Sequence, residues 1–299
     1  MHTYSLPSTS IGLIGYGEVG KIFAAALQAK GAQSVSAWDR LFIDGERGTG
    51  TGIQCCASLA DLLQRCDLVF SAVTASQTLA VAHEAAGLLR PGTVFVDLNS
   101  ASPNTKRDGA AAIEAAGGRY VEAAVMTSVP PYGLRVPMLL GGPHARELAP
   151  LLCAWGLDAK AASAKLGTAS AIKMCRSVVI KGLEAIAVES FTAARAYGVE
   201  DEVLASLKET FPGIDWERQG SYFFERVIQH GQRRSEEMAE SAATMADVGI
   251  GGSMAAAASQ RQAWTAALAR QGVFGPSADG WRARADEILA AVTPTQLQK

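Results

Sequence analysis

The chain changes character about halfway along, as judged by the spacing of its apolar and polar positions. Up to about residue 160, short apolar runs alternate with segments of helical periodicity, and after Gly167 Ala-rich helical segments fill the rest. The predicted strands cover residues 11–14, 34–39, 67–73, 93–97, 119–125 and 136–140. The predicted helices cover residues 21–30, 78–89, 103–116, 168–197, 203–210, 216–230, 232–246, 254–270 and 279–292. Because such alternation is typical of a parallel sheet covered on both faces, we predict an α/β fold, with a doubly wound sheet domain at residues 1–163 and an all-α domain at residues 164–299.

A glycine-rich turn follows the first predicted strand. Gly15, Gly17 and Gly20 satisfy the spacing G-x-G-x-x-G where a strand should give way to a helix. The first glycine permits a tight turn, the second lets the backbone approach a pyrophosphate, and the third lets helix pack on strand; the N–H groups that open the helix bind the anion. We therefore predict a Rossmann-type domain that binds NAD, with NADP possible, the alternative being an ordinary strand-to-helix turn. The residues expected to contact the cofactor are Gly15, Tyr16, Gly17, Glu18, Val19, Gly20, Asp39, Arg40, Val73 and Thr74.

The preference for NAD rests on the end of the second predicted strand. Asp39 lies about 20 residues beyond the glycines, where the adenine ribose is expected. A carboxylate there accepts hydrogen bonds from both ribose hydroxyls and repels a 2′-phosphate. Arg40 and Arg47 offer positive charge that could accommodate NADP instead.

A second glycine cluster, residues 249–252, has a different context. It follows the polar stretch 241–247 and no strand precedes it. We interpret it as a break between two helices, with Ser253 as the N-cap of the second.

Composition narrows the classes of partner. A net charge of −2 and a pI near 6.1 give no electrostatic reason to expect nucleic acid or a membrane surface as a partner. The five cysteines are odd in number and lack C-x-x-C spacing, which favours free thiols in a reducing cytoplasm, and the four scattered histidines do not favour a metal site. We expect neither a signal peptide nor a membrane span, because no basic-then-apolar leader and no sufficiently long apolar run is present.

Three segments are placed to hold a substrate, because ligands of an open parallel sheet bind beyond the carboxyl ends of its strands. Asn99 and Ser100 follow one strand, the alternative role of that segment being helix capping by Ser102. Residues 126–128 follow the next strand, the alternative being an ordinary turn. Lys173 lies on a largely apolar stretch that opens the long helix, where an ammonium is out of place unless its environment uses it. The alternative is a surface lysine whose head reaches solvent.

A basic motif in the all-α domain is the last candidate. Gly231 is predicted to break the helical pattern, so that His230, Arg233 and Arg234 lie near a helix start and present donors to a carboxylate or phosphate. The alternative is a solvated charged face in which both arginines pair with Glu237.

These motifs resemble those of the β-hydroxyacid dehydrogenases, which include 3-hydroxyisobutyrate and 6-phosphogluconate dehydrogenases. The likeness covers roughly residues 10–197: G-x-I-G-x-G-x-M-G corresponds to residues 12–20, D-x-S-T-x-x-P to residues 97–103, D-A-P-V-S-G-G to residues 122–128, and the spacing Gly-x-x-x-x-x-Lys to Gly167 and Lys173. Residues 126–128 (Met-Thr-Ser) replace the family's carboxylate-binding Ser-Gly-Gly, and Ser177 replaces its Asn. The chain is therefore similar to a divergent, 6-phosphogluconate dehydrogenase-like branch in which an H-G-x-R-R motif follows later.

The resemblance implies an NAD(P)-dependent dehydrogenase acting on CH–OH donors, which transfers a hydride between nicotinamide and the hydroxyl or carbonyl carbon of a hydroxyacid or larger alcohol. It implies that Lys173 is the general acid and base, and that Asn99, Ser100 and Ser177 orient the substrate oxygen. The expected substrate contacts are Asn99, Ser100, Met126, Thr127, Ser128, Ser177, His230, Arg233 and Arg234.

Decarboxylation is not expected. Ile180 stands where decarboxylating relatives carry a glutamate, and Glu184, on the same predicted helix face, lies about 16 Å beyond Lys173. The resemblance also implies a homodimer formed through the helical domain. The alternatives are an imine reductase-like enzyme, although such enzymes generally lack the lysine, and a non-catalytic NAD(P)-binding sensor.

Overall fold

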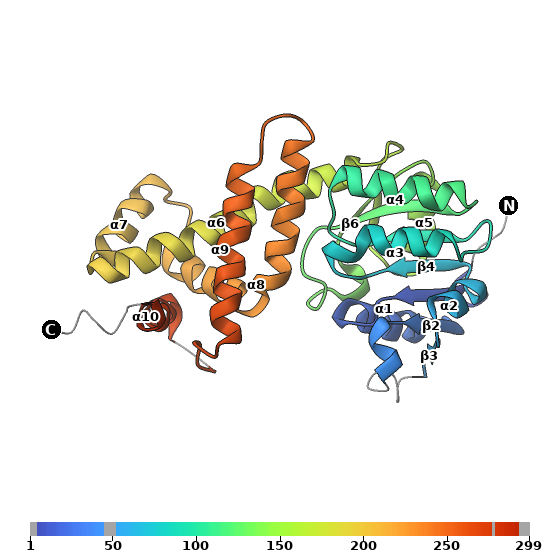
Figure 1. Cartoon of the computed structure of the whole chain (residues 1–299), viewed down its shortest axis with the longest axis horizontal. Helices are drawn as coiled ribbons and strands as arrows, with labels where there is room; N and C mark the ends of the chain where they lie inside the picture. Colours follow the sequence, from blue (N-terminus) through green and yellow to red (C-terminus); the bar gives the residue numbers. More distant parts are fainter. Residues whose placement is uncertain (1–4, 45–51, 277–278, 293–299) are drawn as a thin grey trace. The chain divides into compact units, whose positions relative to one another are not determined.

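The chain folds into two compact units, Met1–Met174 and Cys175–Lys299 (Figure 1). The computed structural model describes residues 5–44, 52–276 and 279–292, so that Arg47 lies outside the described residues. The division between the units falls inside the long helix α6 (Thr168–Tyr197), after the boundary at residue 163 that the sequence suggests. Each unit has its own hydrophobic core.

The first unit is built on one sheet of eight strands in the order β3-β2-β1-β4-β5-β6-β7-β8. Strands β1 to β6 are mutually parallel, β7 runs antiparallel to β6, and β8 runs parallel to β7. The strands are β1 (Ser10–Ile14), β2 (Ser34–Trp38), β3 (Gln54–Cys55), β4 (Leu68–Ser71), β5 (Val94–Asp97), β6 (Arg119–Val125), β7 (Met138–Gly141) and β8 (Ala159–Ser163).

The sheet is parallel as predicted except at β7, which runs antiparallel to β6. The connection between β6 and β7, residues 126–137, contains one 3-10 turn (Gly133–Arg135) and no α-helix. It therefore lacks the helix that usually joins parallel strands, and the chain folds back beside β6. Strands β3 and β8 escaped prediction because the first has two residues and the second, Ala-Lys-Ala-Ala-Ser, carries almost no apolar signal.

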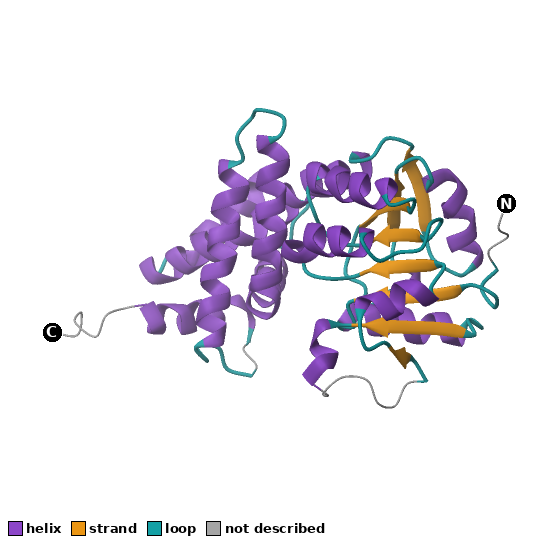
Figure 2. Ribbon diagram, turned by 45° about the vertical axis from the view of Figure 1, so that its right-hand side comes forward, coloured by secondary structure: helices purple, strands orange, loops and turns teal. Residues whose placement is uncertain are grey.

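Helices cover both faces of the sheet (Figure 2). One face packs against α1 (Glu18–Ala29) and α5 (Ala145–Ala154). The other packs against α2 (Leu59–Arg65), α3 (Thr78–Ala86) and α4 (Pro103–Ala115). Successive side chains of a strand point to opposite faces, so that Leu68 and Phe70 lie in the first core and Val69 in the second. This confirms the doubly wound architecture.

The second unit is helical. It contains most of α6 together with α7 (Glu200–Thr210), α8 (Trp216–Ala246), α9 (Ser253–Arg270) and α10 (Gly280–Val292). Its core is rich in aromatic side chains: Phe191 packs at a tilt against Trp281, 5.0 Å between ring centroids, and Phe224 also contacts Trp281. Among the described residues, no helix combines the length and apolar character needed to cross a membrane.

Two predictions about helix ends in this unit are wrong. The predicted break at Gly231 does not occur, because α8 is continuous. Gly231 instead lies where α9 packs directly against α8: an added Cβ would lie 2.7 Å from the carbonyl oxygen of Gln262. The N-cap of α9 is Gly252, and Ser253 is the first helical residue. The predicted break at residues 249–252 itself is confirmed.

We predict that Gly231→Ala destabilises the protein although alanine favours helix. The higher helix propensity of alanine would stabilise the protein by about 1 kcal/mol. The new methyl group would overlap backbone of α9 and force the helices apart at a cost of about 1–3 kcal/mol, so we expect a net loss of up to about 2 kcal/mol. Gly182→Ala in α6 is the matched control, because its added Cβ would meet nothing within 4 Å. Urea denaturation midpoints should fall for the first variant and rise slightly for the second; equal rises in both would contradict the packing role of Gly231.

Candidate active site

The loops that leave β1, β4 and β5 lie at one edge of the sheet, because these strands are parallel neighbours. The strand order changes direction between β1 and β4, with β2 on one side of β1 and β4 on the other. In doubly wound sheets this switch point opens a crevice for ligands. The segments that leave the strands there are residues 15–20, 72–74 and 98–100.

The three glycines of the first segment have different environments. Gly15 has a φ of +91°, and its N–H donates to the carbonyl of Trp38 at 2.9 Å. A Cβ on Gly20 would lie 2.2 Å from the oxygen of Gly15, so only glycine lets α1 start so close to the turn. A Cβ on Gly17 would meet nothing within 4 Å. The middle glycine therefore borders open space, as the approach of a pyrophosphate requires.

The start of α1 is suited to an anion. Gly17 is its N-cap and supplies no side-chain hydrogen bond, whereas α2 and α4 are capped by Ser58 and Ser102. The first N–H groups of α1 thus lack a side-chain cap, and together with the helix dipole they are suited to bind a phosphate. Of the flanking residues, Glu18 is exposed and Val19 half-buried. These residues fit a dinucleotide.

Asp39 is held against the glycine turn. Its Oδ2 accepts the N–H of Tyr16 at 2.8 Å, and its Oδ1 accepts the N–H of Leu41 at 3.0 Å. These two bonds fix the carboxylate directly after β2, at the position expected for an adenine ribose ligand. Arg40 is exposed in the short 3-10 helix that follows.

Asn99 joins two of the loops. It is 4% exposed; its Oδ1 accepts the N–H of Val73 at 2.7 Å, and its Nδ2 donates to Ser71 Oγ at 3.0 Å. The amide therefore fixes the loop of Val73 and the exposed Thr74 onto the end of β5. Sequence reasoning placed Asn99 against the substrate oxygen, whereas the structure shows its amide bonded within the protein.

Lys173 and Ser100 meet. The Nζ of Lys173 donates to Ser100 Oγ at 2.6 Å, although 73 residues separate the two in sequence. Both side chains are half-buried. A lysine from the first turns of α6 is thereby held at the end of β5, at the same edge as the glycine turn.

The predicted substrate segment 126–128 follows β6. The N–H of Met126 donates to the carbonyl of Pro137 at 2.9 Å, which closes the end of β6. Thr127 is exposed and Ser128 is half-buried.

Asp97 is a site residue that sequence reasoning missed. Its carboxylate, 1% exposed, accepts from Lys106 Nζ at 2.8 Å, from the Asn99 N–H at 2.9 Å and from the Tyr120 hydroxyl at 2.6 Å. Burial, followed by the charge of Asp97, raises the pKa of Tyr120 well above its ordinary value, so the phenol stays a donor. The network holds the backbone that leads into Ser100.

Glu122 is the second missed residue. It lies on β6 directly opposite Asp97 of β5, and it is fully buried. Its carboxylate accepts hydrogen bonds from N–H groups of residues 167–170, at the start of α6. The sequence signal that could have identified both residues is the presence of one acidic residue in each of two apolar strands, Asp97 in β5 and Glu122 in β6. Such an acid must be compensated when it is buried.

The basic motif of the second unit is arranged differently from either expectation. Arg234 is buried and its Nε donates to Glu184 at 2.8 Å, while Glu237 pairs with Lys181. Arg234 therefore does not present its donors to a ligand, nor do Arg234 and Glu237 form the alternative pair. Burial raises the pKa of Glu184 and lowers that of Lys181.

The remaining members of the predicted set lie on the two long helices. His230 is half-buried and Arg233 exposed on α8. On α6, Ser177 and Lys181 are buried and Ile180 is exposed. Within the described ranges, no group of three or more His, Cys, Asp or Glu side chains is placed to hold a metal ion.

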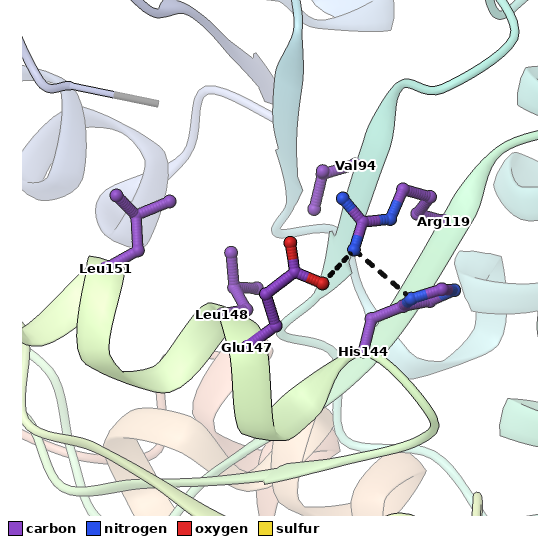
Figure 3. A pocket seen from close by; sticks show the side chains of 6 residues that line it. All are labelled: Val94, Arg119, His144, Glu147, Leu148 and Leu151. Carbon is purple, nitrogen blue, oxygen red and sulfur yellow. Dashed lines mark hydrogen bonds and ion pairs between the residues drawn. The ribbon is translucent and has the colours of Figure 1, made fainter. Parts of the chain in front are cut away.

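A small pocket lies at the opposite edge of the sheet, between the first residues of β5 and β6 and the start of α5 (Figure 3). Arg119, which opens β6, donates to Glu147 and approaches His144 Nδ1 at 3.4 Å. Burial and the charge of Arg119 lower the pKa of His144. Because strands begin at this edge, the pocket is separate from the crevice at the switch point.

Two family models and several solved structures match this chain. Residues 10–145 match the NAD-binding domain of 6-phosphogluconate dehydrogenase, and residues 194–265 match a domain of unknown function, DUF1932. A conserved hypothetical protein from Sinorhizobium meliloti is 37% identical, over 95% of this chain and 98% of its own, with a TM-score of 0.74. A conserved protein of unknown function, whose structure is described as similar to 3-hydroxyacid dehydrogenases, is 31% identical over 88% of this chain and 98% of its own, with a TM-score of 0.64.

More distant structures share the fold. The 3-hydroxyisobutyrate dehydrogenase of Mycobacterium tuberculosis is 18% identical over 94% of this chain and 99% of its own, with a TM-score of 0.68. A reductive aminase from Aspergillus terreus is 16% identical over 95% and 99%, with a TM-score of 0.56. The chain belongs to the β-hydroxyacid dehydrogenase family, in a divergent branch that joins a 6-phosphogluconate dehydrogenase-type NAD-binding domain to DUF1932.

We predict that the buried ion pair beneath the site tolerates loss of both partners better than loss of one. Lys106→Met leaves the Asp97 carboxylate buried without its cation and should lower the free energy of unfolding by about 3–5 kcal/mol. Adding Asp97→Asn should recover part of that loss, since no charge remains buried. The exposed pair of Arg65 and Asp61 is the control, and Arg65→Met should leave the urea denaturation midpoint almost unchanged. Urea denaturation measures all three; a double variant less stable than Lys106→Met would contradict the argument.

Proposed function

We propose that this protein is an NAD(P)-dependent oxidoreductase that interconverts a hydroxyl and a carbonyl group on a small molecule, a hydroxyacid or larger alcohol. The observation that carries the proposal is the 2.6 Å hydrogen bond between Lys173 Nζ and Ser100 Oγ at the carboxyl edge of the sheet. A half-buried lysine held by a hydroxyl at this edge is suited to proton transfer beside a bound dinucleotide.

Lys173 supplies the proton chemistry. In the direction of reduction its ammonium donates a proton to the carbonyl oxygen of the substrate, and in the direction of oxidation its neutral amine removes the hydroxyl proton. Ser100 accepts an N–H of the lysine, so the amine is held in place before the substrate arrives. Ser177, one helical turn after Lys173, is the second hydroxyl that we assign to the substrate oxygen.

The cofactor is held by the first unit. When bound, the nicotinamide supplies or accepts the hydride. The start of α1 would hold the pyrophosphate, with Gly17 leaving room for it, and Val73 and Thr74 would line the same crevice. Asp39, fixed by the N–H groups of Tyr16 and Leu41, favours NAD, because a 2′-phosphate would meet its negative charge.

Decarboxylation is not part of the proposal. Ile180, at the position of the glutamate in decarboxylating relatives, offers no acid, and it is 42% exposed. Glu184 is buried and bound by Arg234, so its carboxylate is engaged elsewhere. Simple oxidation and reduction remain.

Two other functions are outcomes of the test. An imine reductase-like activity is favoured by the shared fold of the reductive aminase, but the positioned Lys173 favours a hydroxyl substrate. A sensor that binds the dinucleotide without turnover would need the glycine turn and Asp39. It would not need the hydrogen bond between Lys173 and Ser100, which we assign to proton transfer.

Titration with NADH and NADPH, followed by a screen of hydroxyacids, aryl alcohols and the corresponding carbonyl compounds, tests the proposal. We predict tighter binding of NADH and turnover of at least one hydroxyl substrate. Lys173→Met should lower kcat by about 10²–10⁴-fold while leaving the Kd for the cofactor unchanged, because it removes only proton transfer. Lys165→Met, an exposed lysine just before α6, is the matched control and should keep full activity.

The outcomes separate the three functions. Undiminished turnover of an alcohol by Lys173→Met would contradict the assigned acid and base. Cofactor binding with no turnover of any hydroxyl, carbonyl or imine compound would support the sensor, and turnover of imines alone would support the reductase.

A further inference from the structure

The first turn of α6 is held by a carboxylate that comes from the sheet. Glu122 Oε1 accepts the N–H groups of Gly167 at 2.8 Å and Ala169 at 3.1 Å. Its Oε2 accepts the N–H of Ser170 at 3.3 Å and the hydroxyl of the same residue at 2.8 Å. All four donors belong to the start of the helix that carries Lys173. Glu122 thus performs across the fold what an N-cap residue ordinarily does from within the chain.

The rest of the sheet is shaped around this carboxylate. A Cβ on Gly141 of β7 would lie 2.1 Å from Glu122 Oε1, so the neighbouring strand has no side chain where the carboxylate sits. Glu122 itself is 0% exposed. A buried charge is costly unless hydrogen bonds and an opposite charge compensate it, and here the positive end of α6 supplies both.

The same arrangement determines where Lys173 lies. Lys173 is three residues after Ser170, so a change in the rotation of the first turn moves its side chain directly; a shift by one residue turns it by 100°. Its partner Ser100 follows Asp97, which is the register neighbour of Glu122 and has its own network. Each member of the Lys173–Ser100 pair is therefore fixed by one of two adjacent buried carboxylates.

We propose that Glu122 is a positioning residue for the acid–base lysine: by binding the start of α6 it sets the rotation at which Lys173 meets Ser100. The catalytic meaning of this rests on the proposed function, whereas the positioning itself does not. Glutamine at this position has one acceptor oxygen, and its amide N–H would face donors on Ser170. The cap would lose one arm, and the first turn of α6 would loosen.

The test uses the full-length chain and two variants. Glu122→Gln weakens the cap of α6, and Ser58→Ala removes the cap of α2, whose hydroxyl accepts the N–H of Asp61 at 3.0 Å. Ser58 is exposed and contacts none of the residues assigned to substrate or cofactor, so it reports the effect of losing a helix cap alone. The readout is the rate at which acetic anhydride labels Lys173, measured by mass spectrometry against the exposed Lys165 of the same sample.

We expect Glu122→Gln to raise the relative labelling of Lys173 about fivefold, because the amine loses its hydrogen bond to Ser100. With a substrate in hand, kcat should fall about 10²-fold with little change in the Kd for the dinucleotide. Ser58→Ala should lower Tm yet leave both the labelling of Lys173 and kcat unchanged. Wild-type labelling in Glu122→Gln, or an equal change in Ser58→Ala, would overturn the proposal.

A second variant covers failure of the first to fold. Glu122→Asp keeps the charge but withdraws the oxygens by one methylene, so Lys173 labelling should rise in the same direction; wild-type labelling in this variant would also overturn the proposal. Together with Lys173→Met, these variants distinguish the acid–base role of Lys173 from the positioning role of Glu122. If Lys173→Met retains turnover while Glu122→Gln raises the labelling of Lys173, the acid–base role of Lys173 is wrong and the positioning role of Glu122 stands. If Lys173→Met loses turnover while Glu122→Gln leaves the labelling unchanged, the acid–base role stands and the positioning role is wrong.

Discussion

Two adjacent carboxylates buried at one edge of the sheet support the candidate site. Asp97 and Glu122 are register partners on β5 and β6, and neither is more than 1% exposed. Burying them is favourable only because each meets fixed donors: a lysine, a phenol and an N–H group for Asp97, and the start of α6 for Glu122. These donors connect β5, β6, α4 and α6, so the cost of burial is offset only in this one arrangement of the elements.

The dinucleotide side of the site uses the opposite device. There the start of α1 has no side-chain cap, and Gly17 beside it faces open space. The start of α6, by contrast, is bound by the carboxylate of Glu122 from β6. The first unit thus contains a helix start without a side-chain cap beside the glycine turn, and another that is bound by an internal carboxylate. This contrast supports the proposal that an anionic ligand binds at α1 and that α6 carries the acid–base group.

Local signals in the sequence predicted most of this architecture. The glycine turn and the 30-residue helix α6 were recognisable because each depends on residues close together in the chain. The reversal at β7 was not, because it depends on how the chain returns after β6 rather than on apolar periodicity. Gly231 misled for a related reason: glycine favours a break locally, but here α9 lies against it and requires its lack of a side chain. Lys173 could be chosen from its apolar context, whereas the tertiary contacts that hold it could not.

The charged residues of the helical unit illustrate the same limit. Arg234 was grouped with His230 and Arg233 from sequence proximity, yet it is buried against Glu184, fifty positions earlier. Which side chain satisfies a buried guanidinium depends on helix packing, and a motif does not contain that information.

Transfer of deuterium from a reduced nicotinamide labelled at C4 would show whether the protein delivers a hydride to a carbonyl carbon. The protein would be incubated with the labelled cofactor and a set of aldehydes and ketoacids, and the products would be examined by mass spectrometry. If the protein reduces carbonyl groups as we propose, each alcohol product carries one deuterium on the new carbinol carbon, delivered from one face of the nicotinamide. Binding of the labelled cofactor with no deuterium in any alcohol product, or deuterium found only in amine products when amines are supplied, would contradict this proposal.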